Sequence, residues 1–573
     1  MVFVSGERAL VSEAIVLPES SGLVLGTLFS RANECAGEAS GEIGRDDREK
    51  IAAQGAAALL KEYWGRYVAL LRASSGELAV LREPSGALPA FHTVYRRLNI
   101  VFSDVDCLVR DLELNFTINW PYVEAYVAFP YLTCEDTGLE EVVEILPGQC
   151  LPLTGNNTSR AVLWHPFQDR AFDSGTHLDN AARLAQRTLK HCVGSWARQF
   201  PSVLHRLSGG LDSSVVLACL AASKPDTRTT CLNYFGTGMQ EDERFYARLV
   251  CQHLGVDLIE YRNQGQALRL ARPQEMPYAV RPCQYFFYLE HVPLATRVAR
   301  DCGAQSVFDG AGGDALFFQT PGAMAVVDRL RTGRSRDDIW RVALDAAQIE
   351  KKTVWRVLRE ARQIKRGRFK HPISNEYLEY RPYIPRAVIE KFETSARFAH
   401  PWESVAKAAS PGKRFHVFSN SFSGLPGYEP FSSADSPDPI HPIISQPVLE
   451  LFYALPLATL IQGGWDRAVV RDAFAKYLPA QVIRRRGKGA ATATLKQTFE
   501  ANRCEISQIM LEGNLVSRGL LDRQALLNTF ASGTKDPSFT PLVIDYLPME
   551  LWLQKWLRSE NAGVGIRSGN GRS

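Results

Sequence analysis

From about residue 176 onward, short apolar runs alternate with glycine turns and amphipathic helical patterns. The expected strands are Val203–Leu207, Thr229–Phe235 and Gln305–Asp309, and the expected helices are Asn180–Trp196, Ser213–Ala222 and Glu243–Leu254. Strands that alternate with helices at this spacing predict an α/β fold built on a doubly wound parallel sheet. Ligands of such sheets bind where the strands end, so the loops after the strands are where we expect a site.

The first part of the chain has a different pattern, in which short strands are separated by Ser-Gly turns. Strands are expected at Tyr67–Leu71, Glu77–Leu81 and Ile100–Ser103, and Asn119 is placed to cap a helix with Pro121 in its first turn. With 573 residues the chain is too long for one core. We therefore expect one domain over 1–170, a second over 176–558 and a disordered tail over 559–573.

Composition excludes several classes of protein. The net charge of +4 gives no case for nucleic-acid binding, and no stretch approaches the roughly 20 apolar residues of a membrane span. The N-terminus has no basic start before an apolar run, as a secretory signal would. The eleven cysteines are scattered without a CxxC pair, which argues against a disulfide framework or a zinc ribbon. A soluble, cytoplasmic protein with reduced cysteines is expected.

The sequence SGGLDSS, residues 208–214, lies between an expected strand and an expected helix. Two glycines allow a tight turn that brings backbone N–H groups against a phosphate, and the helix N-terminus favours the same negative charge. Asp212 would repel a phosphate unless a cation lay between them, so it is a candidate magnesium ligand. The chain has no GKS or GKT in the Walker A frame, and the alternative is a plain glycine turn with a capping aspartate.

A second glycine turn follows another expected strand in VFDGAGGDALF, residues 307–317. Asp314 could supply a second carboxylate, so that two loops at one sheet edge hold Mg²⁺ over a triphosphate. Gly310–Ala315 also fits the GxGxxA dinucleotide fingerprint. That fingerprint needs an acidic residue ending the next strand, whereas Asp328 lies in a helical, basic stretch.

Two basic segments complete the pattern. In RRRGKGAA, residues 484–491, Lys488 between glycines could neutralise charge on an α-phosphate, although by itself a solvated basic loop is the simpler interpretation. Residues 329–370 carry fourteen Lys or Arg against five Asp or Glu on a helical pattern. This stretch is either a solvated helix face or a docking surface for an acidic partner or peptide.

Together these motifs resemble the asparagine synthetase superfamily. SGGLDSS is similar to its pyrophosphate loop, DGAGGD to its second magnesium loop, and GGWDRAVVRDAFAKYLPAQVIRRRGKG to the C-terminal segment that carries an essential lysine, here Lys488. WGRYVALL, ELAVLREPSGALPAFH and IVFSDVDCLV resemble the glutaminase-type, Ntn-hydrolase-like domain of that family. The resemblance implies an α+β glutaminase-like domain over 1–170 and an ATP-pyrophosphatase synthetase domain over 176–558.

The chain departs from the glutamine-using members of the superfamily. They need a cysteine directly after Met1 as nucleophile, but Val2 stands there and the first cysteine is Cys35. The glutaminase activity is therefore expected to be absent, as in the β-lactam synthetase and lasso-peptide macrolactam synthetase branches. Ala311 occupies the position of the β-lactam branch's catalytic Tyr, and HPIISQPVLE, residues 441–450, looks like the lasso cyclase version of its segment.

The resemblance implies Mg²⁺ on Asp212 and Asp314, Lys488 as a catalytic residue, and adenine contacts from backbone near Arg206, Asn233 and Asp309–Gly310. The nucleotide-binding residues it implies are Arg206, Ser208, Gly209, Gly210, Asp212, Ser213, Ser214, Asn233, Asp309 and Gly310. Asp438 falls near the position of the catalytic Glu and is either a base for the attacking amine or a turn former between prolines.

The implied reaction is ATP-dependent closure of a macrolactam in a precursor peptide, with a leader peptidase as partner. A small-molecule β-lactam or amide synthetase, or an ammonia-using asparagine synthetase-like enzyme, is the alternative within enzymes. A non-catalytic scaffold that keeps the fold is the alternative outside them.

Overall fold

The structure is a computed structural model of the chain. It describes residues 14–567 apart from 33, 35–37, 42, 74, 131, 154–159, 169–176, 223–226, 237–241, 263–275, 283–284, 320–321, 332–334, 367–380, 425–435 and 488–491. For 285–291, 420–424, 492–495, 497 and 559–567 it describes the backbone alone.

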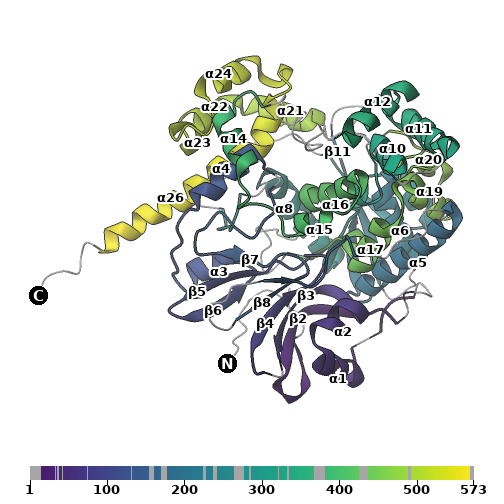
Figure 1. Ribbon diagram of the computed structural model, residues 1–573, viewed down its shortest axis with the longest axis horizontal. Coiled ribbons are helices and arrows are strands. Elements are labelled where there is room, and N and C mark those ends of the chain that lie inside the picture. The colour runs from purple at the N-terminus through teal and green to yellow at the C-terminus, as the bar shows by residue number, and fades with distance from the viewer. Residues whose placement is uncertain are drawn as a thin grey trace, which may run out of the picture.

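The first part of the chain forms two antiparallel sheets, seen in purple and blue in Figure 1. The larger sheet has the strand order β1-β2-β3-β4-β8-β9 and the smaller one β6-β5-β7. The strands of the larger sheet are β1 (Ala14–Val16), β2 (Gly22–Ser30), β3 (Tyr63–Arg72), β4 (Leu78–Arg82), β8 (Gln149–Pro152) and β9 (Ala161–Val162). Those of the smaller sheet are β5 (Phe91–Tyr95), β6 (Leu98–Phe102) and β7 (Val143–Glu144). The strands expected near Tyr67, Glu77 and Ile100 are confirmed as β3, β4 and β6.

Four helices accompany these sheets: α1 (Arg45–Gln54), α2 (Ala56–Glu62), α3 (Val105–Arg110) and α4 (Trp120–Ala128). The expected cap of α4 is confirmed, because the Asn119 side-chain oxygen accepts a hydrogen bond from the Tyr122 backbone N–H at 3.3 Å. Pro121 lies in the first turn, where its missing N–H costs nothing.

The second part of the chain contains a five-stranded parallel sheet in the order β12-β11-β10-β13-β14. Its strands are β10 (Ser202–Arg206), β11 (Arg228–Phe235), β12 (Asp257–Arg262), β13 (Ser306–Phe308) and β14 (Asp438–Ile440). The connecting helices include α5 (Leu178–Ala197), α6 (Leu211–Ala222), α7 (Arg244–Leu254) and α8 (Tyr285–Cys302). The parallel sheet confirms the α/β class expected from the sequence.

Both faces of this sheet are covered by helices. Val203, Cys231 and Phe308 share a buried cluster with α5, α6 and α7. Leu204, Leu232 and Val307, the alternate positions of the same strands, share another with α8. Side chains of a strand point alternately to its two faces, so the sheet is doubly wound, as the unbroken apolar runs predict.

Some of the buried clusters combine residues from both parts of the chain, although others belong to one part alone. Phe29 of β2 packs against Trp64 of β3 and Trp196 of α5, with ring centroids 4.6 and 4.8 Å apart. Near the other end of the chain, Trp556 packs against Phe116 and Tyr278. The sequence division at residues 170–176 separates the antiparallel sheets from the parallel one, and aromatic side chains pack across it.

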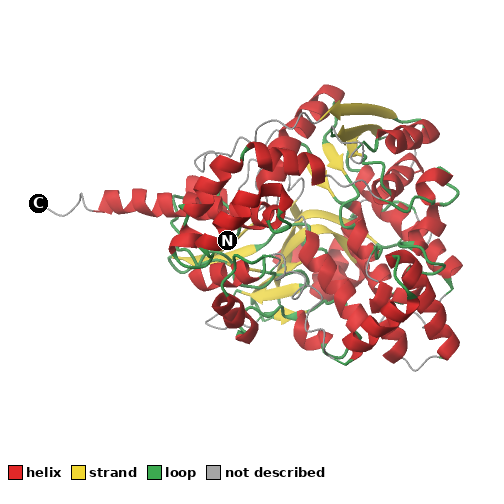
Figure 2. Cartoon of the chain, turned by 90° about the horizontal axis from the view of Figure 1, so that it is seen from above, coloured by secondary structure: helices red, strands yellow, loops and turns green. Residues whose placement is uncertain are grey.

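Further helices surround the sheet or form a lobe at the C-terminus (Figures 1 and 2). Those near the sheet are α9 (Gly313–Leu316), α10 (Gly322–Arg331), α11 (Arg336–Glu350), α12 (Val354–Lys365), α15 (Trp402–Ala406), α16 (Pro411–Gly424), α17 (Gln446–Ala454), α18 (Leu457–Leu460), α19 (Ala468–Phe474) and α20 (Ala480–Ile483). Helix α14 (Arg386–Thr394) lies instead beside α4, in the lobe (Figure 1). The remainder are α21 (Thr492–Ala501), α22 (Arg503–Leu511), α23 (Asn514–Ser517), α24 (Arg523–Ser532), α25 (Phe539–Pro541) and α26 (Leu547–Arg567).

Helix α26 continues to Arg567, into the segment expected to be disordered from residue 559. Its first half is buried at Leu551, Trp552 and Trp556, and each residue added to an existing helix gains a hydrogen bond.

In the described part of the chain, no helix is both long and apolar enough to cross a membrane. The cysteines of this part are all free thiols, from Cys107 to Cys504.

Candidate active site

The turn after β10 is shaped by Gly209 and Gly210. Gly209 has φ +82°, and a Cβ there would lie 2.9 Å from the Glu243 carbonyl oxygen, so the loop packs closely on the start of α7. A side chain at this position would be strained in conformation and obstructed in space. The sequence SGGLDSS is thus a tight loop that opens directly into α6, as the strand–loop–helix pattern predicts.

The three serines of this loop have two different roles. The Ser208 Oγ accepts from the Gly210 backbone N–H at 3.2 Å and lies 3.2 Å from the Ser213 Oγ. Both Ser208 and Ser213 line a cleft at this edge of the sheet. Ser214 is fully buried and donates its hydroxyl to the Gly210 carbonyl at 2.7 Å. Ser208 and Ser213 can therefore meet a ligand, whereas Ser214 holds the turn.

The loop after β13 packs directly on the first loop. A Cβ at Gly310 would lie 2.5 Å from the Ser213 nitrogen, and one at Gly313 would lie 2.5 Å from the Asp212 Cγ. The GAGG sequence is therefore needed for two adjacent strand-end loops to touch. This packing, rather than dinucleotide binding, accounts for the glycine pattern. Asp328 lies inside α10, where it accepts from the Gly412 N–H at 2.8 Å.

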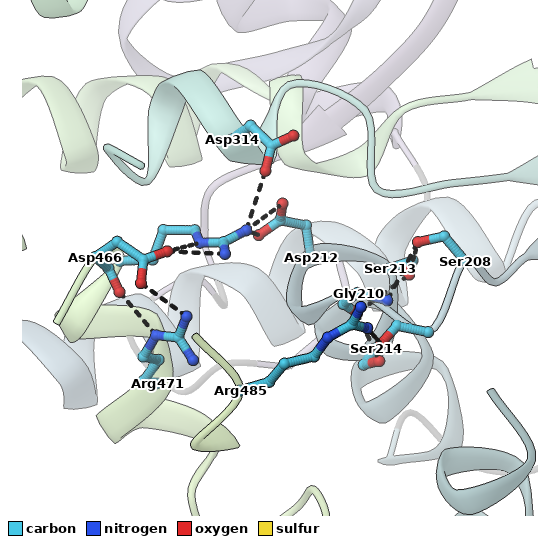
Figure 3. A network of polar contacts seen from close by, with 11 residues as sticks. Ser208, Gly210, Asp212, Ser213, Ser214, Asp314, Asp466, Arg471 and Arg485 are labelled. Carbon is cyan, nitrogen blue, oxygen red and sulfur yellow. Dashed lines mark hydrogen bonds and ion pairs between the residues drawn. The ribbon is translucent and has the colours of Figure 1, made fainter. Parts of the chain in front are cut away.

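Asp212 and Asp314 converge on one cationic nitrogen (Figure 3). The Arg467 Nη1 lies 3.1 Å from the Asp212 Oδ2 and 3.0 Å from the Asp314 Oδ1. Asp212 is largely buried, whereas the Asp314 side chain is 42% exposed. The two carboxylates thus come together beside the cleft, as the two loops predict.

Arg467 is held by further contacts. Its Nη2 lies 2.8 Å from Asp466, and Asp466 also binds the Nη2 of Arg471 at 2.9 Å (Figure 3). Arg467 adopts the left-handed conformation with φ +53°, which is uncommon for a residue other than glycine. Burial opposes its charge, but Asp212, Asp466 and Asp314 outweigh this effect and raise the pKa of Arg467.

The cleft has a volume of about 370 Å³ and opens at the carboxyl ends of β10, β11 and β13. Its lining combines loop backbone, acidic groups and arginines. The lining residues are Arg206, Leu207, Ser208, Gly210, Leu211, Asp212, Ser213, Leu232, Tyr234, Asp309, Gly310, Ala311, Gly312, Asp314, Arg467, Arg471, Val482, Arg485 and Gly487. Both signs of charge face one space, which suits a phosphate ligand accompanied by a metal cation.

The pair Asp212 and Asp314 fits a magnesium ion by the chemistry of its donors. Carboxylate oxygens are the ligands that Mg²⁺ prefers, and it is commonly bound by one or two of them together with phosphates and water. The Arg467 guanidinium stands where a cation between the two would lie. Within the described ranges, no group of three or more His, Cys, Asp or Glu is gathered to bind a metal unaided. Water and phosphate oxygens commonly complete the shell of such an ion.

Asp309 and Arg206 line one side of the cleft, and His441 contacts Asp309. The Asp309 carboxylate pairs with Arg206, accepts from the Ala311 N–H at 3.0 Å and lies 2.8 Å from the His441 Nδ1. Burial acts to raise the pKa of Asp309, but His441 and Arg206 outweigh it and hold that pKa below its usual range. Asp309 is thus a fixed anion that orients Arg206 at the cleft.

Asn233 does not face the cleft with its side chain. It is buried, and its Nδ2 donates to the Leu207 carbonyl at 2.7 Å, which ties β11 to the first loop. Its neighbours Leu232 and Tyr234 line the cleft instead. The expected contact near Asn233 therefore involves the strand around it rather than its amide.

The structure does not bring Asp438 to the cleft. Asp438 begins β14 opposite Ser306, the first residue of β13, so it lies at the amino edge of the sheet. There it is bound by Arg66 of β3, with the Arg66 Nη1 2.9 Å and Nη2 2.5 Å from its two oxygens. The base suggested by the sequence is replaced by a structural ion pair. The strand carries His441, at its other end, to Asp309.

Lys488 lies outside the described residues. The described chain reaches the cleft through Arg485 and Gly487, which stands directly before Lys488. Arg485 pairs with Glu243 and stacks on the Tyr246 ring, with its Cζ 4.0 Å from the ring centroid. Arg485 therefore brings the basic segment against the start of α7, on which the first loop also packs.

Sequence reasoning missed Arg467, Arg471 and His441. The first two lie in the GGWDRAVVRDAF segment, where the only signal was a pair of arginines four residues apart. That spacing places both on one helical face. His441 gave no signal, since its place depends on the pairing of β14 with β13.

Comparisons with known proteins agree with the parallel-sheet part of the chain. A family model described as asparagine synthase matches residues 184–558. No curated protein matches the chain.

Two solved structures that match are U34-tRNA thiolase NcsA from Methanococcus maripaludis and glutamine-dependent NAD+ synthetase from Acinetobacter baumannii in complex with ADP. The first is 16% identical, covers 28% of this chain and 53% of its own, and has a TM-score of 0.18. The second is 10% identical, covers 47% and 64%, and has a TM-score of 0.17. The chain spans less than two thirds of either protein, and TM-scores this low establish no shared overall fold.

Proposed function

The chain belongs to the asparagine synthase family, whose model matches more than half of it, and on this premise we propose that it is an AMP-forming amide ligase. ATP would activate a carboxylate as an acyl-adenylate, and an amine would then displace AMP. The observation that carries the proposal is the convergence of Asp212 and Asp314 on one cationic position beside a loop of backbone N–H groups. Two acids in this position can bind the metal cation of a metal–phosphate ligand that lies between the loops.

ATP would lie across the carboxyl edge of the sheet. Its pyrophosphate portion would meet the backbone of Gly210, the hydroxyls of Ser208 and Ser213 and the N-terminus of α6, which all favour negative charge. The adenine would lie toward Leu232 and Tyr234, where the lining is apolar and aromatic. Arg206, fixed by Asp309, would border this end.

Asp212 and Asp314 would hold Mg²⁺. When bound, the ion supplies neutralisation of the triphosphate and polarisation of its oxygens. For a nucleotide to bind in this way, Arg467 has to leave its position between the two carboxylates, and its guanidinium would then be available to the phosphates.

In the first step an oxygen of the substrate carboxylate attacks the α-phosphorus, and the bond from that phosphorus to the bridging oxygen of pyrophosphate breaks. Negative charge grows on the leaving pyrophosphate. Arg471 and Arg485 line the cleft as cations that can stabilise it, and Arg467 can do the same once it has left the two carboxylates. We assign Lys488, beyond Gly487, to the same task on the resemblance of its segment to the family's lysine loop.

In the second step an amine attacks the carbonyl carbon of the acyl-adenylate and loses a proton to solvent, and AMP leaves with the former carboxylate oxygen. The sum is carboxylate, amine and ATP converted into amide, AMP and pyrophosphate. The cleft walls hold the reactants in place, which makes the attack effectively unimolecular.

We further propose that the carboxylate is an Asp or Glu side chain of a precursor peptide and the amine is that peptide's own N-terminus, as in lasso-peptide macrolactam synthetases. The segment HPIISQPVLE supports this choice, and Ala311 supports it over the β-lactam-forming relatives. A leader peptidase that frees the amine would then act beforehand. The first part of the chain, with its two antiparallel sheets, would be a glutaminase-type domain without that activity.

The test is to incubate the purified protein with Mg·ATP and candidate precursor peptides with a free N-terminus. We expect AMP, pyrophosphate and a peptide lighter by one water. An open-chain amide from a small acid and an amine would favour the small-molecule alternative. Release of ADP, or tight ATP binding with no AMP from any acid, would refute the ligase proposal.

A further inference from the structure

Two adjacent helices carry exposed apolar and basic side chains that the proposed reaction does not use. On α11, Arg336, Trp340 and Leu344 follow one another at spacings of four residues. On α12, Trp355, Arg359 and Arg362 lie at i, i+4 and i+7. Such spacings place side chains on one helix face. We call these six residues the Trp340–Trp355 patch.

The two halves of the patch form one continuous surface. The Trp340 and Trp355 rings meet edge to face with centroids 5.4 Å apart, yet they are 41% and 66% exposed, and Leu344 is 48% exposed. The opposite faces of both helices are buried, through Val342 and Ala346 and their neighbours on α11 and through Val357, Leu358 and Ala361 on α12. The core thus fixes the helices with this face outward, and both helices lie at the edge of the molecule in Figure 1.

The patch has the composition of a binding surface for an acidic chain. Trp and Arg are the residue types most enriched where binding energy concentrates, and large contiguous apolar surface is uncommon on a protein with no use for it. The six positions contain three arginines and no acid. Neighbouring Arg341 and Arg356 are neutralised at 2.7 and 3.1 Å by acids on their own helices. A segment that combines acidic and apolar side chains complements the patch.

Helix α11 also connects the patch to the cleft. Asp345, next to Leu344, accepts from the backbone N–H groups of Gly463 and Gly464. The Gln348 side chain presses on the same turn, since a Cβ at Gly464 would lie 2.1 Å from its oxygen. Two residues beyond Trp465 the chain reaches Arg467, which binds Asp212 and Asp314. One face of α11 is therefore open, and other side chains of the same helix support the cleft.

We propose that the Trp340–Trp355 patch is an exosite for an acidic, apolar segment of the peptide substrate, remote from the carboxylate that reacts. This proposal rests on the ligase function proposed above. Binding at a remote site supplies affinity and holds the reacting carboxylate near the cleft. The support that α11 gives to the Gly463–Arg467 turn provides a route by which occupancy can affect the cleft.

Binding is tested first, on the full chain without ATP. The probe is a fluorescein-labelled peptide in which Glu alternates with Leu and Phe, and its counterpart has Lys in place of Glu. Affinity for the acidic probe is expected to fall about tenfold or more in Trp355→Ala and in Arg359→Glu. The matched controls Leu98→Ala and Arg97→Glu alter an equally exposed apolar and basic hairpin tip between β5 and β6 and should bind as the native chain does.

Equal loss in patch and control variants, or equal binding of the Lys probe, would overturn the exosite. Preferred binding of phosphatidylglycerol vesicles or of single-stranded DNA by the same residues would also overturn it, in favour of a lipid or nucleic-acid surface.

Kinetics separate this proposal from the ligase function. With a peptide that yields AMP, Trp355→Ala should raise KM about tenfold and leave kcat nearly unchanged. AMP formation with an unaltered KM would sink the exosite and leave the ligase standing. If instead probe binding depends on the patch but the protein forms no AMP, the exosite stands and the ligase function is refuted.

Discussion

Two arginine–aspartate clusters lie at opposite edges of the parallel sheet and differ in their stoichiometry. At the amino edge, Arg66 binds Asp438 through two parallel contacts, one cation to one anion. At the carboxyl edge, the single guanidinium of Arg467 is shared among Asp212, Asp314 and Asp466. The first cluster joins the two parts of the chain, and the second faces the cleft.

The difference shows how a structural ion pair can be told from a ligand site. A bidentate one-to-one pair satisfies both charges and leaves no capacity for another ion. Three acids that share two arginines, Arg467 and Arg471, at an open cleft can accept a further cation. The sequence offers Asp314 as a magnesium ligand and Asp438 as a base or a turn former, and their partners in the structure separate the two roles.

The largest effect should come from removing an acid at the carboxyl edge. Asp314→Asn is expected to lower the rate of AMP formation at least about a thousandfold, because the charge that holds the metal–nucleotide ligand is lost. Thermal unfolding should change little, since Asp314 is partly exposed. The control is Asp337→Asn, an exposed acid on α11. A variant that kept half the native rate would contradict the assignment.

Breaking the amino-edge pair should have the opposite profile. Arg66→Met is expected to reduce the free energy of unfolding by about 3 kcal/mol, because Asp438 is left largely buried without its cation. Urea unfolding measures the loss, and the double variant Arg66→Met with Asp438→Leu should recover much of it. The rate of AMP formation per folded molecule should stay near native. A large drop in that rate would indicate that Asp438 takes part in the reaction.

Low pH should destabilise the fold at the carboxyl edge through protonation of His205, whose Nε2 contacts the Ser213 carbonyl at 2.8 Å. Burial lowers the pKa of His205 to about 4. As pH falls from 6.5 to 4, His205 is therefore protonated in the unfolded chain before it is protonated in the folded chain. The stability contributed by neutral His205 is complete above about pH 6.5 and is lost as pH falls toward 4, by about 3 kcal/mol in all.

His205→Gln should therefore flatten the dependence of the unfolding free energy on pH over this window. His400 and His416 are also buried, each with a pKa of about 3, and contribute a background common to both proteins. Parallel curves for the native chain and the variant would show that His205 does not titrate in this way.

The smallest effect concerns the shared arginine. In Arg467→Met the Asp212 and Asp314 carboxylates lose their internal cation, so Mg²⁺ alone should raise the Tm by about 2 °C. In the native chain, where Arg467 competes for the same carboxylates, the shift should be smaller. Calorimetry with and without Mg²⁺, with Ca²⁺-free buffers, measures the difference. Equal shifts in the two proteins would mean that Arg467 and the metal do not share a position.

The sequence was sufficient for β10, β11 and β13, three of the five strands of the sheet, and for both loops, because their signals are local. Val203–Leu207 and Gln305–Asp309 are apolar runs that end in glycines, and local patterns of this kind indicate strand, turn and helix together. The convergence of Asp212 and Asp314 followed from one further rule, that parallel strands end at one edge.

The remaining site residues depend on pairings between distant segments, which local patterns do not contain. β14 is only three residues long and includes Pro439, so its hydrophobic pattern gives no strand signal. Its register with β13 decides that Asp438 faces Arg66 and that His441 reaches Asp309. Arg467 adopts a left-handed backbone that an arginine does not indicate. The packing of Trp556 on Tyr278 likewise joins segments that are far apart in the chain.

The most direct test of the account follows the carboxylate oxygen. A precursor peptide labelled with oxygen-18 in its acidic side chain would be incubated with Mg·ATP, and the nucleotide products examined by mass spectrometry. Attack by that carboxylate on the α-phosphorus predicts one labelled oxygen in each AMP released with amide product. Unlabelled AMP, or label absent from nucleotide with ADP as the product, would contradict adenylation at this cleft.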